Sequence, residues 1–174
     1  MSIENVMIAA NANTVFKAMD YDRETKLVAY AASNSVLILD PYHDTVVEEG
    51  KILATPKVLF GLSGHTTRIN AVQWLTPELI VSIGGDEKAI IVWQKTAGES
   101  AKSPGSWQAA CKLTEAHPAT INYLTTFKAD SALDPLYFTT MCSQGVLKLW
   151  VSNFGEDGKI IFSVKSELLF GRNL

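Results

Sequence analysis

The chain has 174 residues, of which 47% are hydrophobic and 19% are charged, and its formal net charge at pH 7 is -3. This length and balance exclude a disordered chain and allow one domain with a buried core. Lysine and arginine are scattered, so no basic stripe indicates direct nucleic-acid binding. No apolar run reaches the roughly 20 residues of a membrane span, and the N-terminus lacks signal-peptide features. We expect a cytoplasmic protein that is also found in the nucleus, with Cys111 and Cys142 as reduced thiols and a disulfide as the alternative.

Short apolar runs separated by polar turns make up the first third of the chain. The runs lie at residues 15–19, 27–30 and 36–39, and Asp40-Pro41 closes the third run. No apolar 3,4 spacing persists for three helical turns, so the runs favour strands over helices. Residues 57–62 predict an outer strand.

Two stretches predict exposed loops. Residues 41–56 are charged and bounded by prolines, and residues 94–106 are rich in glycine, serine and lysine. These compositions are typical of surface connections. We therefore expect the loops from Pro41 to Pro56 and from Gln94 to Ser106 to be candidate partner-binding segments, on the ground of exposure.

The stretch from Gly64 to Trp93 holds three short apolar runs between a Gly-His pair and a tryptophan. This order resembles one WD40 repeat, the four-stranded blade of a β-propeller, which a Gly-His pair opens and a Trp-Asp pair closes. In this copy the closing pair is Trp93-Gln94. The earlier runs, closed by Leu39-Asp40, resemble a degenerate blade.

The same pattern recurs later in the chain. The spacing His-x-x-x-Ile-Asn occurs at His65 and again at His117, and the next apolar position also matches. The second copy ends at Trp150 after a longer turn at residues 129–135. Two copies with one spacing indicate an internal repeat.

The repeat predicts an all-β WD40 propeller section of about three blades, an incomplete ring of a propeller that would have seven. We place the blades at about residues 6–62, 63–113 and 114–165, with a fourth blade starting at 166–174. Three blades cannot close a ring, so we expect apolar sheet faces to be exposed at both ends. We expect the N-terminal part of a longer protein, with a truncated, partner-dependent product as the alternative.

In a WD40 blade, a histidine, a serine or threonine, an aspartate and a tryptophan form a hydrogen-bonded chain that joins the strands. We expect this structural tetrad in the second blade to be His65, Ser82, Asp86 and Trp93. Asp86 lies one residue further from the tryptophan than is usual. In the third blade an eroded tetrad is expected from His117, Thr140, Gln144 and Trp150. Glutamine cannot supply a carboxylate, so packing should hold that blade more than its polar chain.

The same residue types could also indicate a hydrolase. Nucleophilic catalysis needs an exposed serine and a histidine free to act as a base, whereas these residues are expected to close a blade. The three histidines, His43, His65 and His117, and the two cysteines fit no zinc spacing, and no phosphate-binding loop occurs. We therefore expect no catalytic, metal or cofactor site.

Beyond the general repeat, the chain resembles the N-terminal part of the Elongator complex subunit 2 family. The resemblance is carried by LVAYAASNSVLILDP at 27–41, by LFGLSGHTTRINAVQW at 59–74 and by the third repeat ending in LKLW at 147–150. The family implies two seven-bladed propellers in a complex that modifies the wobble uridine of transfer RNAs. It also implies a scaffold role, in which the protein holds the large scaffold subunit and the catalytic acetyltransferase-like subunit together. This chain covers less than half of such a pair of propellers.

The leading hypothesis is a non-enzymatic scaffold module with other protein subunits as partners, no membrane contact and no cofactor. One alternative is an unrelated WD40 adaptor, for example in ubiquitin ligation or trafficking. A second alternative is a propeller hydrolase with its active site in the central channel.

Overall fold

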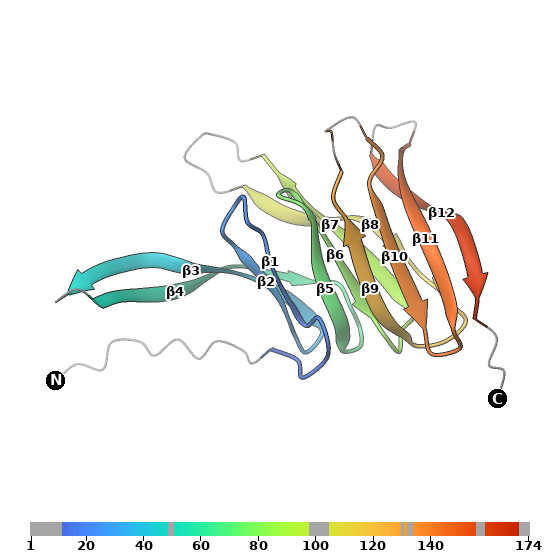
Figure 1. Ribbon diagram of the computed structural model, residues 1–174, viewed down its shortest axis with the longest axis horizontal. Coiled ribbons are helices and arrows are strands. Elements are labelled where there is room, and N and C mark those ends of the chain that lie inside the picture. The colour runs from blue at the N-terminus through green and yellow to red at the C-terminus, as the bar shows by residue number, and fades with distance from the viewer. Residues whose placement is uncertain are drawn as a thin grey trace.

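The computed structural model contains three four-stranded antiparallel sheets, placed side by side along the molecule (Figure 1). It describes residues 12–48, 51–97, 105–129, 131, 134–155 and 159–170. Every regular element in these segments is a strand, and none forms a helix long and apolar enough to cross a membrane. The predicted all-β class, with sheets that match propeller blades, is confirmed.

Each sheet uses four consecutive strands, so the chain completes one sheet before it begins the next. The first contains β1 (Met19–Tyr21), β2 (Val28–Ala32), β3 (Ser35–Glu48) and β4 (Lys51–Ser63). The second contains β5 (Ile69–Thr76), β6 (Leu79–Gly84), β7 (Ala89–Thr96) and β8 (Ser106–Leu113). The third contains β9 (Ile121–Phe127), β10 (Tyr137–Cys142), β11 (Val146–Phe154) and β12 (Ile160–Leu169).

Two apolar cores lie between the sheets. The first and second sheets bury Ala29, Val36 and Ile38 against Val72 and Ile91. The second and third sheets share a core in which β6 and β7 face β9 to β12; it includes Val81, Ile90, Val92, Leu124, Phe138, Trp150 and Phe162. The second sheet is therefore covered on both faces, which explains why the runs LIVSIG and AIIVW are almost continuously apolar.

Backbone hydrogen bonds join neighbouring sheets in a repeating register. The Ile69 amide donates to the Ser33 carbonyl of the first sheet at 2.9 Å, and the Ile121 amide donates to the Gly85 carbonyl of the second sheet at 3.2 Å. Donor and acceptor are each displaced by 52 residues (121 − 69 and 85 − 33), which equals the His65 to His117 displacement of the sequence repeat. The internal repeat is thus also a repeat of the contacts between sheets.

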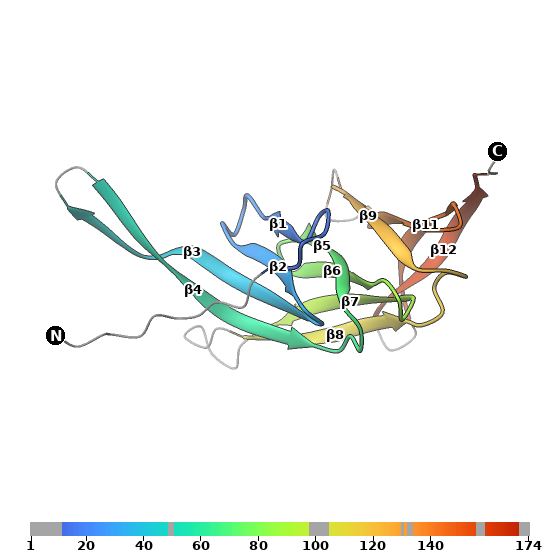
Figure 2. The same ribbon diagram turned by 90° about the horizontal axis from the view of Figure 1, so that it is seen from below.

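The prediction of a surface loop at residues 41–56 is wrong, because β3 runs to Glu48 and β4 starts at Lys51. The two strands form a ribbon that extends well away from the sheets (Figure 2). The register shifts between Asp40 and Asp44, and Pro41 lies within this irregularity, where a missing amide hydrogen is tolerated. The prolines therefore mark a bulge and not the limits of a loop.

Other boundaries also differ from the predicted ones. The proposed start of a fourth blade at 166–174 falls inside β12, whose Ser166 to Leu169 pair with β11; residues 171–174 lie outside the described segments. The ends of the predicted loop at 94–106 belong to β7 and β8, and its residues 98–104 are also outside them, as are residues 1–11. In the first sheet, β1 occupies Met19–Tyr21, later than the predicted run at 15–19.

Candidate functional site

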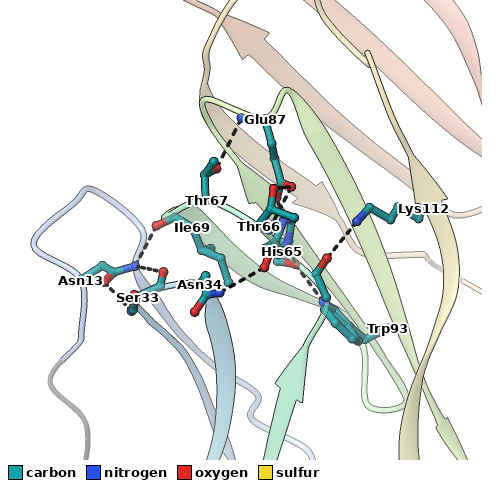
Figure 3. A network of polar contacts seen from close by, with 12 residues as sticks. Asn13, Ser33, Asn34, His65, Thr66, Thr67, Ile69, Glu87, Trp93 and Lys112 are labelled. Atoms are coloured by element: carbon teal, nitrogen blue, oxygen red, sulfur yellow. Dashed lines mark hydrogen bonds and ion pairs between the residues drawn. The ribbon is translucent and has the colours of Figure 1, made fainter.

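A buried polar chain crosses the second sheet (Figure 3). His65, in the connection from β4 to β5, places its Nε2 2.7 Å from the Ser82 hydroxyl on β6. The Trp93 indole on β7 donates to the same hydroxyl at 2.8 Å. Ser82 is completely buried and His65 is 4% exposed, so three of the four predicted tetrad residues meet in the core.

The carboxylate of this chain comes from Glu87 and not from the predicted Asp86. Glu87 Oε1 contacts His65 Nδ1, while its Oε2 accepts the Thr66 amide at 3.0 Å and the Thr66 hydroxyl at 2.6 Å. Glu87 lies six residues before Trp93, so the extra residue noted for Asp86 disappears. Asp86 itself is exposed and accepts a hydrogen bond of 3.4 Å from the hydroxyl of Thr120, the residue before β9.

The protonation of the pair follows from its burial. Burial lowers the pKa of His65 more than the Glu87 carboxylate raises it. Burial raises the pKa of Glu87, but the hydrogen bonds from Thr66 and His65 outweigh this effect and leave that pKa lowered. The favoured state is a neutral histidine that donates its Nδ1 hydrogen to an ionised glutamate, with Trp93 and Ser82 donating in the same direction along the chain.

Gly84 at the end of β6 leaves the space that this pair occupies. A Cβ atom at this position would lie 2.6 Å from His65 Nδ1 and would also overlap the Glu87 carboxylate. A side chain at this position would force His65 or Glu87 to shift, so glycine at the end of β6 gives the two side chains room to meet.

The third sheet has a similar chain without a carboxylate. His117 Nε2 lies 2.7 Å from the Thr140 hydroxyl, to which the Trp150 indole donates at 2.8 Å. Gln144 is exposed, and the buried Nδ1 of His117 has no hydrogen-bond partner among the residues that the structure describes. Three of the four residues of the eroded tetrad therefore come together and Gln144 does not join them. Burial, with a smaller effect of Lys148, lowers the pKa of His117 to about 4.

Pro118 explains why the carboxylate is missing in the third sheet. The alignment of His65 with His117 places Pro118 at the position of Thr66 and Ala119 at that of Thr67. Thr66 supplies two donors to Glu87, and the Thr67 hydroxyl accepts the Glu87 amide at 3.4 Å. Proline and alanine can supply none of these interactions. A carboxylate in this blade would therefore have few hydrogen-bond donors. Comparing the residues after each histidine in the sequence could have predicted this difference.

These two chains hold strands together and do not form a catalytic arrangement. Ser82 and Thr140 are fully buried, and each hydroxyl is occupied by a histidine and a tryptophan, so neither is accessible for attack on a substrate. In the part of the chain that the structure describes, no three histidine, cysteine or acidic residues cluster as metal ligands would.

The third sheet packs one face against the second sheet, and its other face points away from the second sheet. Successive strand residues alternate between faces. In β10 and β11, Phe138 and Trp150 are buried against the second sheet, while the intervening residues are half-buried or exposed. We call this surface the open face. It carries Tyr123, Phe127, Tyr137, Met141, Leu147, Leu149, Val151, Ile161 and Leu168.

The open face occupies the same place in its sheet as a face that is covered in the second sheet. Val92 on β7 lies opposite Val81 on β6, and both are fully buried against the third sheet. The corresponding pair in the third sheet is Leu149 opposite Thr139, and both are half-buried. The expected exposure of an apolar sheet face is confirmed at this end of the molecule.

Comparison with known proteins agrees with the resemblance seen in the sequence. No protein-family model matches the chain. Over 103 residues, 59% of this chain, it is 32% identical to Elongator complex protein 2 of Drosophila melanogaster. Over 129 residues, 71% of this chain, it is 28% identical to Elongator complex protein 2 of Danio rerio. The matched regions cover 12% and 13% of these curated relatives, so the chain spans a small part of their length.

Proposed function

We propose that this chain is a non-enzymatic scaffold section of an Elongator-type complex, built from three WD40 blades. The observation that carries the proposal is the similarity to Elongator complex protein 2 from two animals, over most of the chain in one alignment. Three four-stranded sheets with repeating contacts supply the rigid framework that a scaffold needs. The role in wobble-uridine modification of transfer RNA follows from that assignment and is part of the proposal.

The polar residues support a scaffold and not a hydrolase. The histidine, hydroxyl and tryptophan groups form hydrogen bonds that join segments of one blade, and the Ser82 and Thr140 hydroxyls are buried. Propellers that carry out catalysis need reactive groups at an accessible surface. The proposed partners are therefore protein subunits, including the large scaffold subunit and the catalytic subunit of the complex.

The open face supports the idea that further protein covers this section. Its apolar residues repeat the positions that the second sheet buries against the third. Large exposed apolar patches on soluble proteins usually mark interaction sites. A further blade-like sheet fits this face best, because the third sheet covers the second in the same way. That sheet belongs either to the same polypeptide or to another subunit.

Affinity purification tests the assignment. The tagged chain is purified at its natural abundance from its own cells, and the bound proteins are identified by mass spectrometry. We expect the homologues of the other Elongator subunits in constant ratio to the bait. Their absence, in a preparation that recovers the intact chain, contradicts the Elongator assignment and leaves the fold unaffected.

A further inference from the structure

A groove lies along the ends of the three sheets on the side away from the buried histidines. It is bounded by the β1–β2 turn, by the β5–β6 turn at Pro77 and by the described residues between β9 and β10. The β1–β2 and β5–β6 turns are at the upper ends of their strands in Figure 1. The groove therefore crosses all three blades and differs in place from the open face, which is the side of one sheet.

The size of the groove indicates a polypeptide ligand. Its volume is about 1540 Å³, above the roughly 300–1,000 Å³ of most small-molecule pockets. Leu75, Pro77 and Leu136 form part of its lining, so a bound segment would have apolar contacts as well as polar ones. An extended peptide that crosses all three blades would contact lining residues from each of them.

The charge of the groove favours a positively charged polypeptide. Four acidic residues line it against two basic ones, Arg23 and Lys128. The acidic residues are Asp20, Asp22, Glu24 and Asp134. Three of them accept hydrogen bonds from backbone amides, which orient the carboxylates. None of the six side chains forms an ion pair with another residue of the described segments, so the acidic excess is not neutralised locally.

Exposed aromatic side chains add a second preference for cations. Tyr21 is 44% exposed and Phe154 is 78% exposed, and both line the groove. Aromatic faces attract the ammonium and guanidinium groups of lysine and arginine. Carboxylates and aromatic rings thus favour the same class of side chain along one groove.

We propose that this groove binds an extended segment of a partner protein that carries several lysine or arginine residues. The inference rests on the proposed scaffold function and adds the chemistry of one partner contact. Arg23 and Lys128 could hold a phosphate, but a nucleic acid would meet repulsion from twice as many carboxylates. The observations therefore favour a basic polypeptide over RNA.

Fluorescence anisotropy with the full chain tests the proposal. Two labelled peptides of about 12 residues, roughly 40 Å when extended, are identical except that one carries four arginines and the other four glutamates. A uridine oligonucleotide of similar length is the third probe. The expected result at low ionic strength is binding of the arginine peptide, weakened by added salt, with much weaker binding of the other two probes.

Charge-neutral variants locate the contact. Asp22→Asn combined with Glu24→Gln removes two charges from the groove and keeps the acceptor that Asp22 offers to Thr25. The matched control, Asp44→Asn combined with Glu115→Gln, removes two exposed charges elsewhere. We expect at least about fivefold weaker binding of the arginine peptide for the groove variant and no change for the control. Glu24→Lys, at a side chain with no hydrogen bond in the described segments, should weaken binding further.

The inference is overturned by any of three results: the arginine peptide does not bind, both double variants weaken it equally, or the glutamate peptide or the oligonucleotide binds as tightly. Failure of the groove with intact recovery of Elongator subunits would remove this inference alone. Peptide binding without such recovery would remove the proposed complex alone.

Discussion

At the scale of single residues, the carboxylate that accepts a hydrogen bond from His65 contributes to the stability of the second blade. Glu87 accepts from Thr66 and His65, whereas the neighbouring Asp86 is exposed and has one long contact with Thr120. The two residues are adjacent and chemically similar. Their difference is that only the glutamate reaches back over the turn.

Replacing Glu87 with alanine should therefore lower the free energy of unfolding by about 1–3 kcal/mol, because the buried Nδ1 hydrogen of His65 loses its acceptor. The same change at Asp86 should alter it by about 0.5 kcal/mol or less, as at most surface positions. Urea denaturation of the two variants measures both. Equal losses would contradict the assignment of Glu87.

The lone histidine of the third blade should make the protein sensitive to acid. His117 has a pKa of about 4 in the folded chain and an ordinary value of 6.5 when unfolded. Because the folded value is depressed, the stability it contributes is complete above about pH 6.5 and is lost as the pH falls toward 4. The charged groups near it are Lys148, which lowers its pKa, and Glu167, which raises it.

The free energy of unfolding should fall by about 2 kcal/mol between pH 7 and pH 5 from His117 alone. His65 adds to this loss in the same direction, because its pKa is also lowered. NMR titration of the imidazole signals, combined with urea denaturation at several pH values, measures the effect. A His117 signal that titrates near pH 6.5 in the folded protein would disprove this explanation.

The missing carboxylate of the third blade can be restored only together with its donors. Gln144→Glu alone should not stabilise the chain, because Pro118 offers no amide hydrogen. The double variant Gln144→Glu with Pro118→Thr should have a free energy of unfolding about 1–2 kcal/mol higher than the two single changes predict when added. This is the size expected for hydrogen bonds to a charged group. A double-mutant cycle by thermal or urea unfolding gives this coupling energy, and a value near zero would count against the explanation.

At the scale of elements, most strands could be predicted from the sequence and the ribbon could not. The apolar runs LIVSIG and AIIVW of the second sheet are continuous because both faces are buried, so the sequence predicts both strands. The β3–β4 ribbon could not be predicted, because the charged residues and prolines of 41–56 are typical of a loop, whereas the two strands continue beyond the rest of the sheet. The carboxylate was also missed, since spacing along a turn does not show which of two acidic residues points inward.

The ribbon should be dispensable for the fold of the sheets. Asp40 pairs directly with Lys57, so an Asn-Gly turn can join these positions in place of residues 41–56. We expect the free energy of unfolding to change by about 1 kcal/mol or less, because residues 41–44, 55 and 56, the part of that segment whose side chains the structure describes, belong to neither core. Urea denaturation of the shortened chain checks this. Collapse of the first sheet would show that the ribbon supports it.

At the scale of the whole molecule, the same kind of sheet face occurs three times: it is buried in each of the two cores and is exposed as the open face. The first and second sheets are packed together, the second and third are packed together, and no other described segment covers the open face of the third. Lys17, which precedes β1, also reaches the third sheet, where its Nζ donates to the Leu124 carbonyl at 3.0 Å. A direct contact between the first and third sheets thus adds to the contacts between neighbouring sheets.

The central claim is that the open face joins this section to the rest of an Elongator-type assembly. The most direct test compares Leu149→Glu, on the open face, with Phe16→Glu, at a side chain that is 74% exposed elsewhere. Both changes place one charge on an apolar surface position, and circular dichroism confirms that each variant keeps its strands. We predict that Elongator subunits copurify with the Phe16→Glu chain and are lost from the Leu149→Glu chain. Equal recovery with both variants would contradict the account.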